Sequence, residues 1–317
     1  MIFKELFENK GLSLDRLKSF MEVVEAGSIV LAAGQDPNRQ SQFSRQIKEL
    51  EFFFGAELTR REGRRITITE EGERLARIIR SSFTDLSDFR ADSQHEARRV
   101  VLAAGASVIE WLLPPAFLQM RRDMKEPVIV TQHARSSDVI RGLDDGRIDM
   151  GIMRGDALPS AMAAFPIGSL SYRLFVPKEL SIEKRPRHAK GWDHFLSQLP
   201  QARLLGGRMR RAVDEAHQAM AIRPQIVAEM SSFLQLAALV RSGSCAAILP
   251  VTASAIFPRH EFDSFELDGF LDYQRDLFLV FNRQHMERRG WGEATMSEVA
   301  KSLGSALRTG VRSGAKK

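Results

Sequence analysis

The sequence predicts a multidomain protein of α+β class, in which an N-terminal winged helix-turn-helix and a long linker helix precede a two-lobed α/β domain. Three observations predict this architecture. The 317 residues, 44% apolar and 27% charged, are enough for two or three packed domains. Apolar residues recur at helical spacing through much of residues 14–95. From residue 99 onward, short strands alternate with helices.

The composition points to a reducing compartment. Cys245 is the single cysteine, so the chain cannot form an internal disulfide or a thiolate metal cluster. The apolar run at residues 100–118 contains Glu110 and two prolines, and therefore does not suit a membrane-spanning helix. The first residues lack the apolar core of a secretion signal. We therefore expect a cytoplasmic protein without a membrane partner.

Three helices are predicted near the N-terminus. The first covers residues 14–26, with Ser13 as its N-cap and Gly27 as its terminator. Ser28 can cap a short second helix. After the breaker GQDPN, Asn38 can cap a third helix, whose apolar stripe is Phe43, Ile47, Leu50 and Phe54.

The second and third helices have the pattern of a helix-turn-helix, whose second helix can enter the major groove of DNA. By pattern alone, a solvated amphipathic helix fits equally well. The segment that follows favours DNA, because Arg64 and Arg65 before ITIT indicate a β-hairpin wing with arginines for the phosphate backbone. The candidate DNA-binding residues are Ser28, Asn38, Arg39, Gln40, Ser41, Ser44, Arg45, Lys48, Arg64 and Arg65.

A long linker helix is predicted from Thr69, with three glutamates in its first turn, where they complement the helix dipole. Its apolar stripe has no evident partner within a thin winged domain. We interpret the stripe as a seam with a second copy of the chain. Its residues are Leu75, Ile79, Phe83, Leu86 and Phe89.

Residues 14–72 resemble the N-terminal domain of LysR-type transcriptional regulators. The resemblance rests on GSIVLAA at 27–33, Gln40, SRQIKELE at 44–51, GAEL at 55–58, Arg61 and ITITEEGERL at 66–75. The rest of the chain, to about residue 308, has the element order expected of the family. Asp36 and Thr59 depart from the usual Leu and Phe. The resemblance implies an operator in double-stranded DNA, a small-molecule effector, and a homodimer or homotetramer. We assign no cofactor.

The predicted domains are a winged helix-turn-helix, a linker helix and an effector-binding domain. Their boundaries are 1–69, 70–95 and 96–317, with lobe I at about 99–167 and 271–310 and lobe II at about 168–270. Repeated β-α-β order implies a mainly parallel sheet with helices on both faces. We also expect a single helix over residues 108–122, despite its prolines.

In parallel sheets, ligands bind beyond the carboxyl ends of the strands. That rule selects the candidate effector-binding residues Ser107, Arg135, Ser136, Arg154, Gly206, Met230 and Ser231. His133 is a further candidate for the cleft, although a lone histidine is more often a structural hydrogen-bonding residue. The resemblance implies effector contacts at Ser107, Ser136 and Arg154, in a cleft like that of periplasmic binding proteins. Our hypothesis is that Arg135 and Arg154 hold an anionic effector; ordinary ion pairs explain the two arginines equally well.

The sequence does not suggest an enzyme. The seven histidines show no metal-binding spacing, and the chain has no nucleophile elbow, phosphate loop or dinucleotide fingerprint. We therefore assign no catalytic residue and no metal ligand. The alternative to a regulator is a small-molecule binding protein whose N-terminal helices only dimerise, without specific DNA recognition.

The net charge of +6 is a poor guide to DNA binding, because residues 1–95 carry 15 basic and 16 acidic side chains. The C-terminal residues 283–317, with 8 basic and 3 acidic side chains, carry most of the excess. The placement of charge carries the prediction instead. Reversing the charge of Arg45 or Arg65 should weaken operator binding and flatten its salt dependence, as measured by gel-shift titration. Deleting the last seven residues should do neither, and greater damage from that deletion would contradict the prediction.

Overall fold

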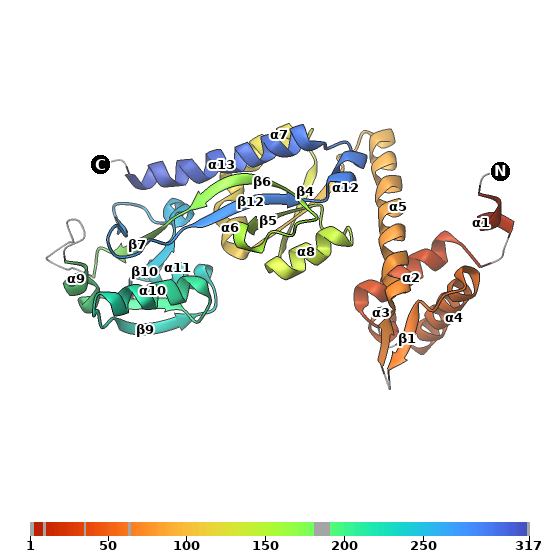
Figure 1. Cartoon of the computed structure of the whole chain (residues 1–317), viewed down its shortest axis with the longest axis horizontal. Coiled ribbons are helices and arrows are strands. Elements are labelled where there is room, and N and C mark those ends of the chain that lie inside the picture. Colours follow the sequence, from red (N-terminus) through yellow and green to blue (C-terminus); the bar gives the residue numbers. More distant parts are fainter. Residues whose placement is uncertain (1–2, 9–10, 35, 63–64, 181–190, 316–317) are drawn as a thin grey trace. The chain divides into compact units, whose positions relative to one another are not determined.

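The computed structural model describes residues 3–8, 11–34, 36–62, 65–180 and 191–315. It divides into two compact units, one of residues 1–98 with 144–147 and one of residues 99–143 with 148–317. Each unit is described by itself (Figure 1). No helix in the described ranges is long and apolar enough to cross a membrane.

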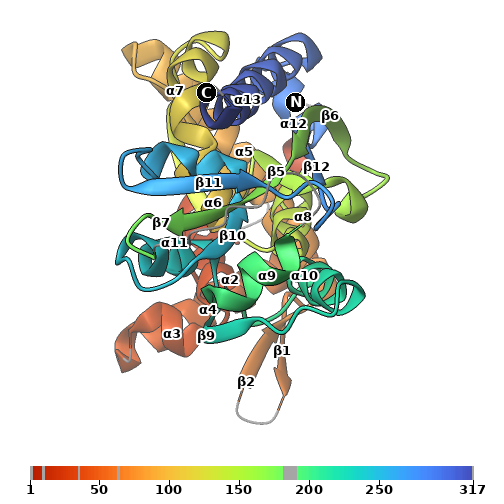
Figure 2. The same ribbon diagram turned by 90° about the vertical axis from the view of Figure 1, so that its left-hand side faces the viewer.

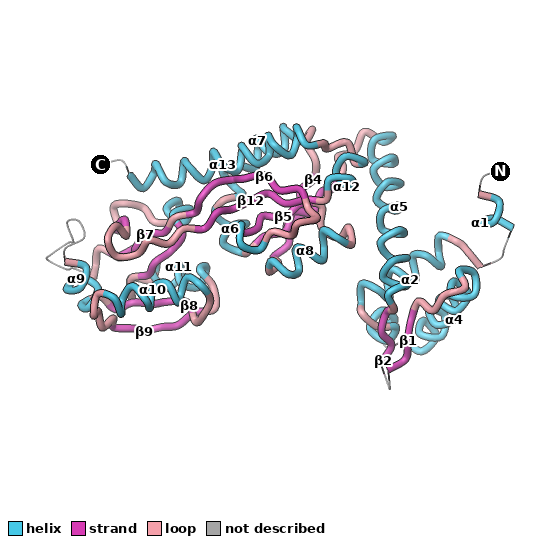
Figure 3. Tube along the Cα trace, in the orientation of Figure 1, coloured by secondary structure: helices cyan, strands magenta, loops and turns pink. Residues whose placement is uncertain are grey.

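The first unit packs helices around one core and adds a two-stranded wing (Figure 3). Phe20, Ile47 and Leu50 lie at the centre of the core, each almost fully buried. The elements are α1 (Lys4–Glu8), α2 (Leu14–Ala26), α3 (Ile29–Ala33), α4 (Pro37–Phe54), β1 (Thr59–Glu62), β2 (Arg65–Ile68) and α5 (Glu70–Gln94).

The predicted caps of the first two helices are confirmed. The Ser13 hydroxyl accepts a hydrogen bond from the Arg16 amide, and Gly27 ends α2 in the left-handed region at φ 73°. The Ser28 hydroxyl caps α3 by accepting from the Leu31 amide at 3.1 Å.

The predicted cap of the third helix is wrong. Asp36, not Asn38, is the N-cap of α4, and its carboxylate accepts from the Asn38 amide at 2.9 Å. Pro37 takes the first helical position, where no backbone donor is needed. The departure of Asp36 from the usual apolar residue thus has a local reason, since a carboxylate caps a helix and a leucine cannot.

The stripe predicted as a dimer seam on α5 divides into two parts. Leu75 and Ile79 are buried in the core of their own chain, so neither is available to a second copy. Phe83 packs partly against the same core. Leu86 and Phe89 are exposed, at 57% and 73%.

In the second unit, lobe I is a five-stranded sheet of order β4-β3-β5-β12-β6. One face packs against α6, α7 and α13, and the other against α8 (Figure 1). The elements are β3 (Arg99–Ala104), α6 (Ala106–Trp111), α7 (Leu113–Asp123), β4 (Val128–His133), α8 (Ser136–Asp144), β5 (Met150–Arg154), η1 (Gly155–Ala157), β6 (Ala163–Leu170), β12 (Arg275–Phe281), α12 (Arg283–Arg288) and α13 (Glu293–Ala315).

Lobe II contains two small sheets, β10-β7-β11 and β8-β9. The Ala202 amide donates to the Ala246 carbonyl, and the Ala246 amide donates to the Pro200 carbonyl, which joins the two sheets. Figure 2 shows the lobe from the side that carries α9, α10 and β9. Strand β7 alternates its side chains between the two cores of the lobe, with Leu174 in one and Phe175 in the other. The elements are β7 (Tyr172–Pro177), α9 (Trp192–Gln198), β8 (Pro200–Leu204), α10 (Arg208–Ala219), β9 (Gln225–Met230), α11 (Phe233–Arg241), β10 (Ala247–Pro250), η2 (Val251–Ile256) and β11 (Phe262–Glu266).

Two predictions for this unit are wrong in detail. The helix expected over residues 108–122 is two helices that meet at Leu112, because Pro114 and Pro115 fit only the first turn of a new helix. The sheet of lobe I is mixed: β3 runs parallel to β4 and β5, but β12 is antiparallel to both its neighbours, β5 and β6.

A buried carboxylate joins the C-terminal segment to the sheet of lobe I. Asp149 lies between β3 and α12 and accepts from the Arg289 guanidinium and the His285 Nε2, both at 2.6 Å, and from the Val101 amide. Burial raises the pKa of this carboxyl, but the His285 hydrogen bond, the Arg289 charge and the Val101 amide outweigh burial. The net result is a lowered pKa.

Replacing Asp149 with Asn should lower the free energy of unfolding of this unit by roughly 3 to 5 kcal/mol at pH 7, because Arg289 loses its buried counter-charge. A lowered pKa means that the carboxylate stabilises the fold above its unfolded value near 3.9 and ceases to do so as the pH falls through the lower folded value. The difference from the parent in thermal unfolding should therefore shrink below about pH 4. The exposed Asp138→Asn control should change stability by less than about 1 kcal/mol. An equally small effect of Asp149→Asn would contradict this account.

Candidate functional site

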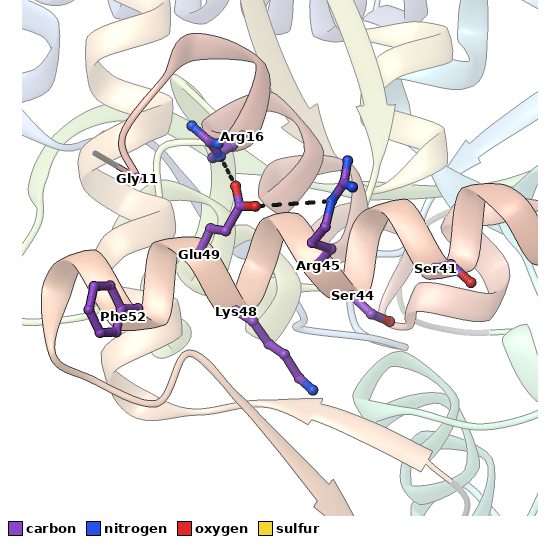
Figure 4. Close-up of a pocket in the computed structure, with 8 residues that line it drawn as sticks. All are labelled: Gly11, Arg16, Ser41, Ser44, Arg45, Lys48, Glu49 and Phe52. Atoms are coloured by element: carbon purple, nitrogen blue, oxygen red, sulfur yellow. Dashed lines mark hydrogen bonds and ion pairs between the residues drawn. The ribbon is translucent and has the colours of Figure 1, made fainter. Parts of the chain in front are cut away.

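The first unit has a hollow of about 620 Å³ beside α4. Ser41, Ser44, Arg45 and Lys48 follow the 3, 4, 7 spacing of one helix face, opposite the buried stripe of the same helix. Gly11, Arg16, Glu49 and Phe52 complete the lining (Figure 4). Three cations and one carboxylate therefore surround the hollow, which is a suitable surface for a polyanion.

Glu49 orients two of the cations. Its carboxylate bonds to the Arg16 guanidinium and lies 4.0 Å from the Arg45 Nε (Figure 4). Lys48 has no acidic partner among the described residues, and Figure 4 shows it directed away from Glu49. Sequence reasoning missed Arg16, because it lies on α2 and only the folded helix pair brings it to the hollow.

The wing is attached to α4 by a second glutamate. The Glu51 Oε1 accepts from the amides of Leu58 and Thr59 at 2.9 and 3.0 Å, and from the Thr59 hydroxyl at 3.2 Å. Thr59, unusual for a position that is commonly Phe, thus adds a hydrogen bond at the base of the wing. The predicted hairpin is confirmed, with Arg61 of β1 opposite Ile66 of β2.

Four other DNA-binding candidates, Ser28, Asn38, Arg39 and Gln40, do not line this hollow. Arg39 stays near α2, with its guanidinium 3.5 Å from the Glu22 carboxylate and 5.5 Å from the Phe43 ring centroid. The Ser28 hydroxyl is engaged as a helix cap. Asn38 and Gln40 lie in the first turn of α4. Arg64 falls outside the described residues, and Arg65 is described only as the first residue of β2.

The second unit has a cavity of about 510 Å³ where β5 and β6 of the lobe I sheet end and β12 begins. Four predicted residues, Ser107, Arg135, Ser136 and Arg154, line this cavity together. The rest of its lining is Gly105, Val108, Ala134, Ser137, Val139, Ile152, Met153, Leu170, Tyr172, Phe233, Arg275 and Leu277.

Arg275 lines the cavity but was not among the predicted effector-binding residues, and it adds a third arginine to the site. The prediction considered only the carboxyl ends of parallel strands. Because β12 runs antiparallel to β5 and β6, its amino end lies beside their carboxyl ends. The register places Arg275 opposite Leu170 and Leu277 opposite Arg154. The signal was present, since the basic side chain directly precedes the strand DLFLVF.

His133, Gly206, Met230 and Ser231 do not line this cavity. His133 and Gly206 are exposed. The Met230 carbonyl accepts from the Leu205 amide, and the Ser231 hydroxyl donates to Gln235.

The cavity lining carries three arginines, and it contains no acidic residue among the residues described. One of the three has an acidic neighbour: the Arg154 Nε lies 3.4 Å from the Asp156 carboxylate. That carboxylate also pairs with Arg208 at the start of α10, in lobe II. Asp156 therefore links the two lobes beside the cavity.

Each of the two units matches the profile of a known protein family. A profile described as "Bacterial regulatory helix-turn-helix protein, lysR family" matches residues 14–73, and one described as "LysR substrate binding domain" matches residues 93–289. The chain belongs to the LysR family of transcriptional regulators. This LysR-type protein is therefore a DNA-binding regulator with an effector-binding domain and not an enzyme. The alternative of a binding protein without DNA recognition is set aside.

Relatives of this LysR-type regulator carry consistent names. A probable nitrogen assimilation transcriptional activator of Synechococcus elongatus is 26% identical over 263 residues, covering 79% of this chain and 82% of the relative. PerR of Escherichia coli is 30% identical over 156 residues, covering 49% and 51%. CbnR, solved with its target DNA, shares the fold at a TM-score of 0.59 and 18% identity, covering 91% of this chain and 100% of CbnR.

Replacing Ser28 with Ala should remove the α3 cap and lower the free energy of unfolding by about 1 kcal/mol. Operator affinity should change by less than about threefold, since the hydroxyl serves the helix. The matched Ser41→Ala variant should weaken operator binding and leave the free energy of unfolding almost unchanged, because Ser41 lines the hollow. Thermal unfolding and gel-shift titration separate the two effects. Loss of DNA affinity in Ser28→Ala at unchanged stability would place Ser28 on the DNA.

Proposed function

We propose that this regulator reads an operator with the exposed face of α4 and responds to a small anion bound in the cavity between its lobes. The single observation that carries the effector half is the lining of that cavity, with three arginines and no acid among the described residues. Guanidinium groups are suited to carboxylates and similar anions, which they bind through paired hydrogen bonds.

On the DNA side, Ser41 and Ser44 are placed to contact base edges, since they lie toward the start of the reading helix. Arg45 and Lys48 follow on the same face, and we assign them to phosphate. Arg16 joins them as a third cation from α2. Glu49 keeps Arg16 and Arg45 oriented in the free protein, and the phosphate backbone replaces Glu49 as their partner on the operator.

The pairing of two copies is also proposed. Leu86 and Phe89 are the exposed members of the predicted seam on α5, and Ile78 is exposed on the same helix at 57%. Large apolar side chains of this kind favour pairing with a second helix. Two copies place two reading helices on one duplex, about one helical turn apart. Because its target is the chromosome, we place the protein in the cytoplasm.

We propose that the effector acts on the placement of the lobes. Asp156 bonds to Arg154 in lobe I and to Arg208 in lobe II. An anion on Arg154 competes with Asp156 and so changes the link between the lobes. A ligand can shift such an equilibrium only by its difference in affinity for the two arrangements.

Gel-shift titration of the full chain tests the DNA half, using the duplex upstream of its own gene at about 150 mM salt. Binding should be at least about a thousandfold tighter than to random duplex. Equal binding to both duplexes would contradict operator recognition.

Arg154→Ala tests the effector half. In cells that carry a reporter behind the upstream DNA, this variant should no longer respond to the inducing condition, while its footprint on that DNA persists. Arg141→Ala, which removes an exposed arginine paired with Asp138 on α8, is the matched control. A normal response in Arg154→Ala would contradict the assignment.

A further inference from the structure

The two segments that cross between the lobes meet at one corner of the cavity. On the outward crossing, β6 ends at Leu170 and β7 begins at Tyr172; on the return crossing, β12 begins at Arg275. Arg275 lies opposite Leu170 in the sheet register. Leu170, Tyr172 and Arg275 all line the cavity.

Tyr172 has an unused hydrogen-bonding group at this corner. Its side chain is 5% exposed, and its hydroxyl has no hydrogen-bond partner among the described residues. A buried hydroxyl without a partner is costly, and Tyr172 lines the cavity, so a ligand that supplies the partner would remove that cost. Burial raises the pKa of this phenol well above its usual value near 10, which keeps it neutral and able to donate.

Arg275 is held against the Tyr172 ring. Its guanidinium carbon lies 5.7 Å from the Tyr172 ring centroid and 5.6 Å from that of Tyr273, and its Nε donates to the Tyr273 hydroxyl at 3.0 Å. No carboxylate of a described residue lies within 4.0 Å of it, in contrast to Arg154 with Asp156. Stacking fixes the plane of the guanidinium and leaves its outer N–H groups for an anion.

Apolar side chains line the same part of the cavity. Leu170 and Leu277 come from lobe I, and Phe233 comes from the start of α11 in lobe II. The centroids of the Phe233 and Tyr172 rings are 5.9 Å apart. Such walls favour a ligand with an apolar, flat body, whereas an inorganic anion would leave them in contact with water.

We propose that Tyr172 and Arg275 form a carboxylate subsite, and that the effector is an aromatic carboxylate whose ring lies against Phe233, Leu170 and Leu277. The inference rests on the proposed anionic effector and names its chemical class. It also makes Arg275 the principal anchor and leaves Arg154, which already pairs with Asp156, as the second arginine for the anion. Because both anchors lie on the crossing segments, the ligand binds at the hinge.

Calorimetric titration and thermal unfolding of the full chain test this proposal, with sodium benzoate, neutral benzamide and sodium sulfate as probes at constant ionic strength. Benzoate should raise the melting temperature more than sulfate does, and benzamide should leave it unchanged. The Kd for benzoate should increase about tenfold in Tyr172→Phe and at least tenfold in Arg275→Lys, which keeps the charge but loses the planar fork.

Two controls separate binding from folding. Tyr172→Phe removes a hydroxyl that has no partner, so the unliganded variant should melt at the parent temperature or above. Arg141→Lys, at an exposed arginine of α8 that does not line the cavity, should change the Kd by less than about threefold. A lower melting temperature for unliganded Tyr172→Phe would assign that hydroxyl to folding and overturn its role.

The remaining outcomes are distinguishable. If benzoate binds equally to the parent, Tyr172→Phe and Arg275→Lys, the subsite is overturned and the anionic cavity stands. If sulfate stabilises as strongly as benzoate, the aromatic class is overturned and the cationic site stands. If neither anion stabilises the protein, both the subsite and the proposed anionic effector are overturned.

Discussion

The antiparallel insertion of β12 between β5 and β6 is the constraint on which the effector domain depends. The chain leaves lobe I through β6 and must return to complete the same sheet, and β12 provides that return in the middle of the sheet. Since β12 runs opposite to its neighbours, it begins where β5 and β6 end, with Arg275 opposite Leu170 of β6 and Leu277 opposite Arg154 of β5. The strand ends on this side of the sheet therefore bring Arg154, Leu170 and Arg275 together, and all three line the cavity.

A buried carboxylate joins elements inside lobe I, whereas a partly exposed carboxylate joins the two lobes beside the cavity. Within lobe I, the nearly buried Asp149 accepts hydrogen bonds from His285 of α12, from Arg289 after that helix and from the backbone of β3. Asp156, by contrast, is a partly exposed carboxylate shared by an arginine of each lobe. Exposed ion pairs contribute little to stability, so a ligand can replace this one at small cost. Such a contrast suits a domain whose lobes change their relative placement.

Sequence reasoning succeeded where local rules decide the outcome. The caps Ser13 and Ser28, the hairpin wing and the cavity residues at the ends of β3, β4 and β5 all follow from short-range patterns. It failed where tertiary contacts decide. Leu75 and Ile79 have the spacing of a dimer seam, yet both are buried in the core that α5 forms with α2 in the same chain. Arg16 and Arg275 reach their sites only through a helix pair and an antiparallel return, which periodicity does not reveal.

The position of a bound carboxylate tests the central claim most directly. A crystal structure of the full chain grown with saturating benzoate should show the ligand in the cavity, with its carboxylate oxygens within hydrogen-bonding distance of the Arg275 guanidinium and the Tyr172 hydroxyl. The ring should lie against Phe233. A carboxylate that contacts neither Arg275 nor Tyr172, or a cavity without benzoate, would contradict the account.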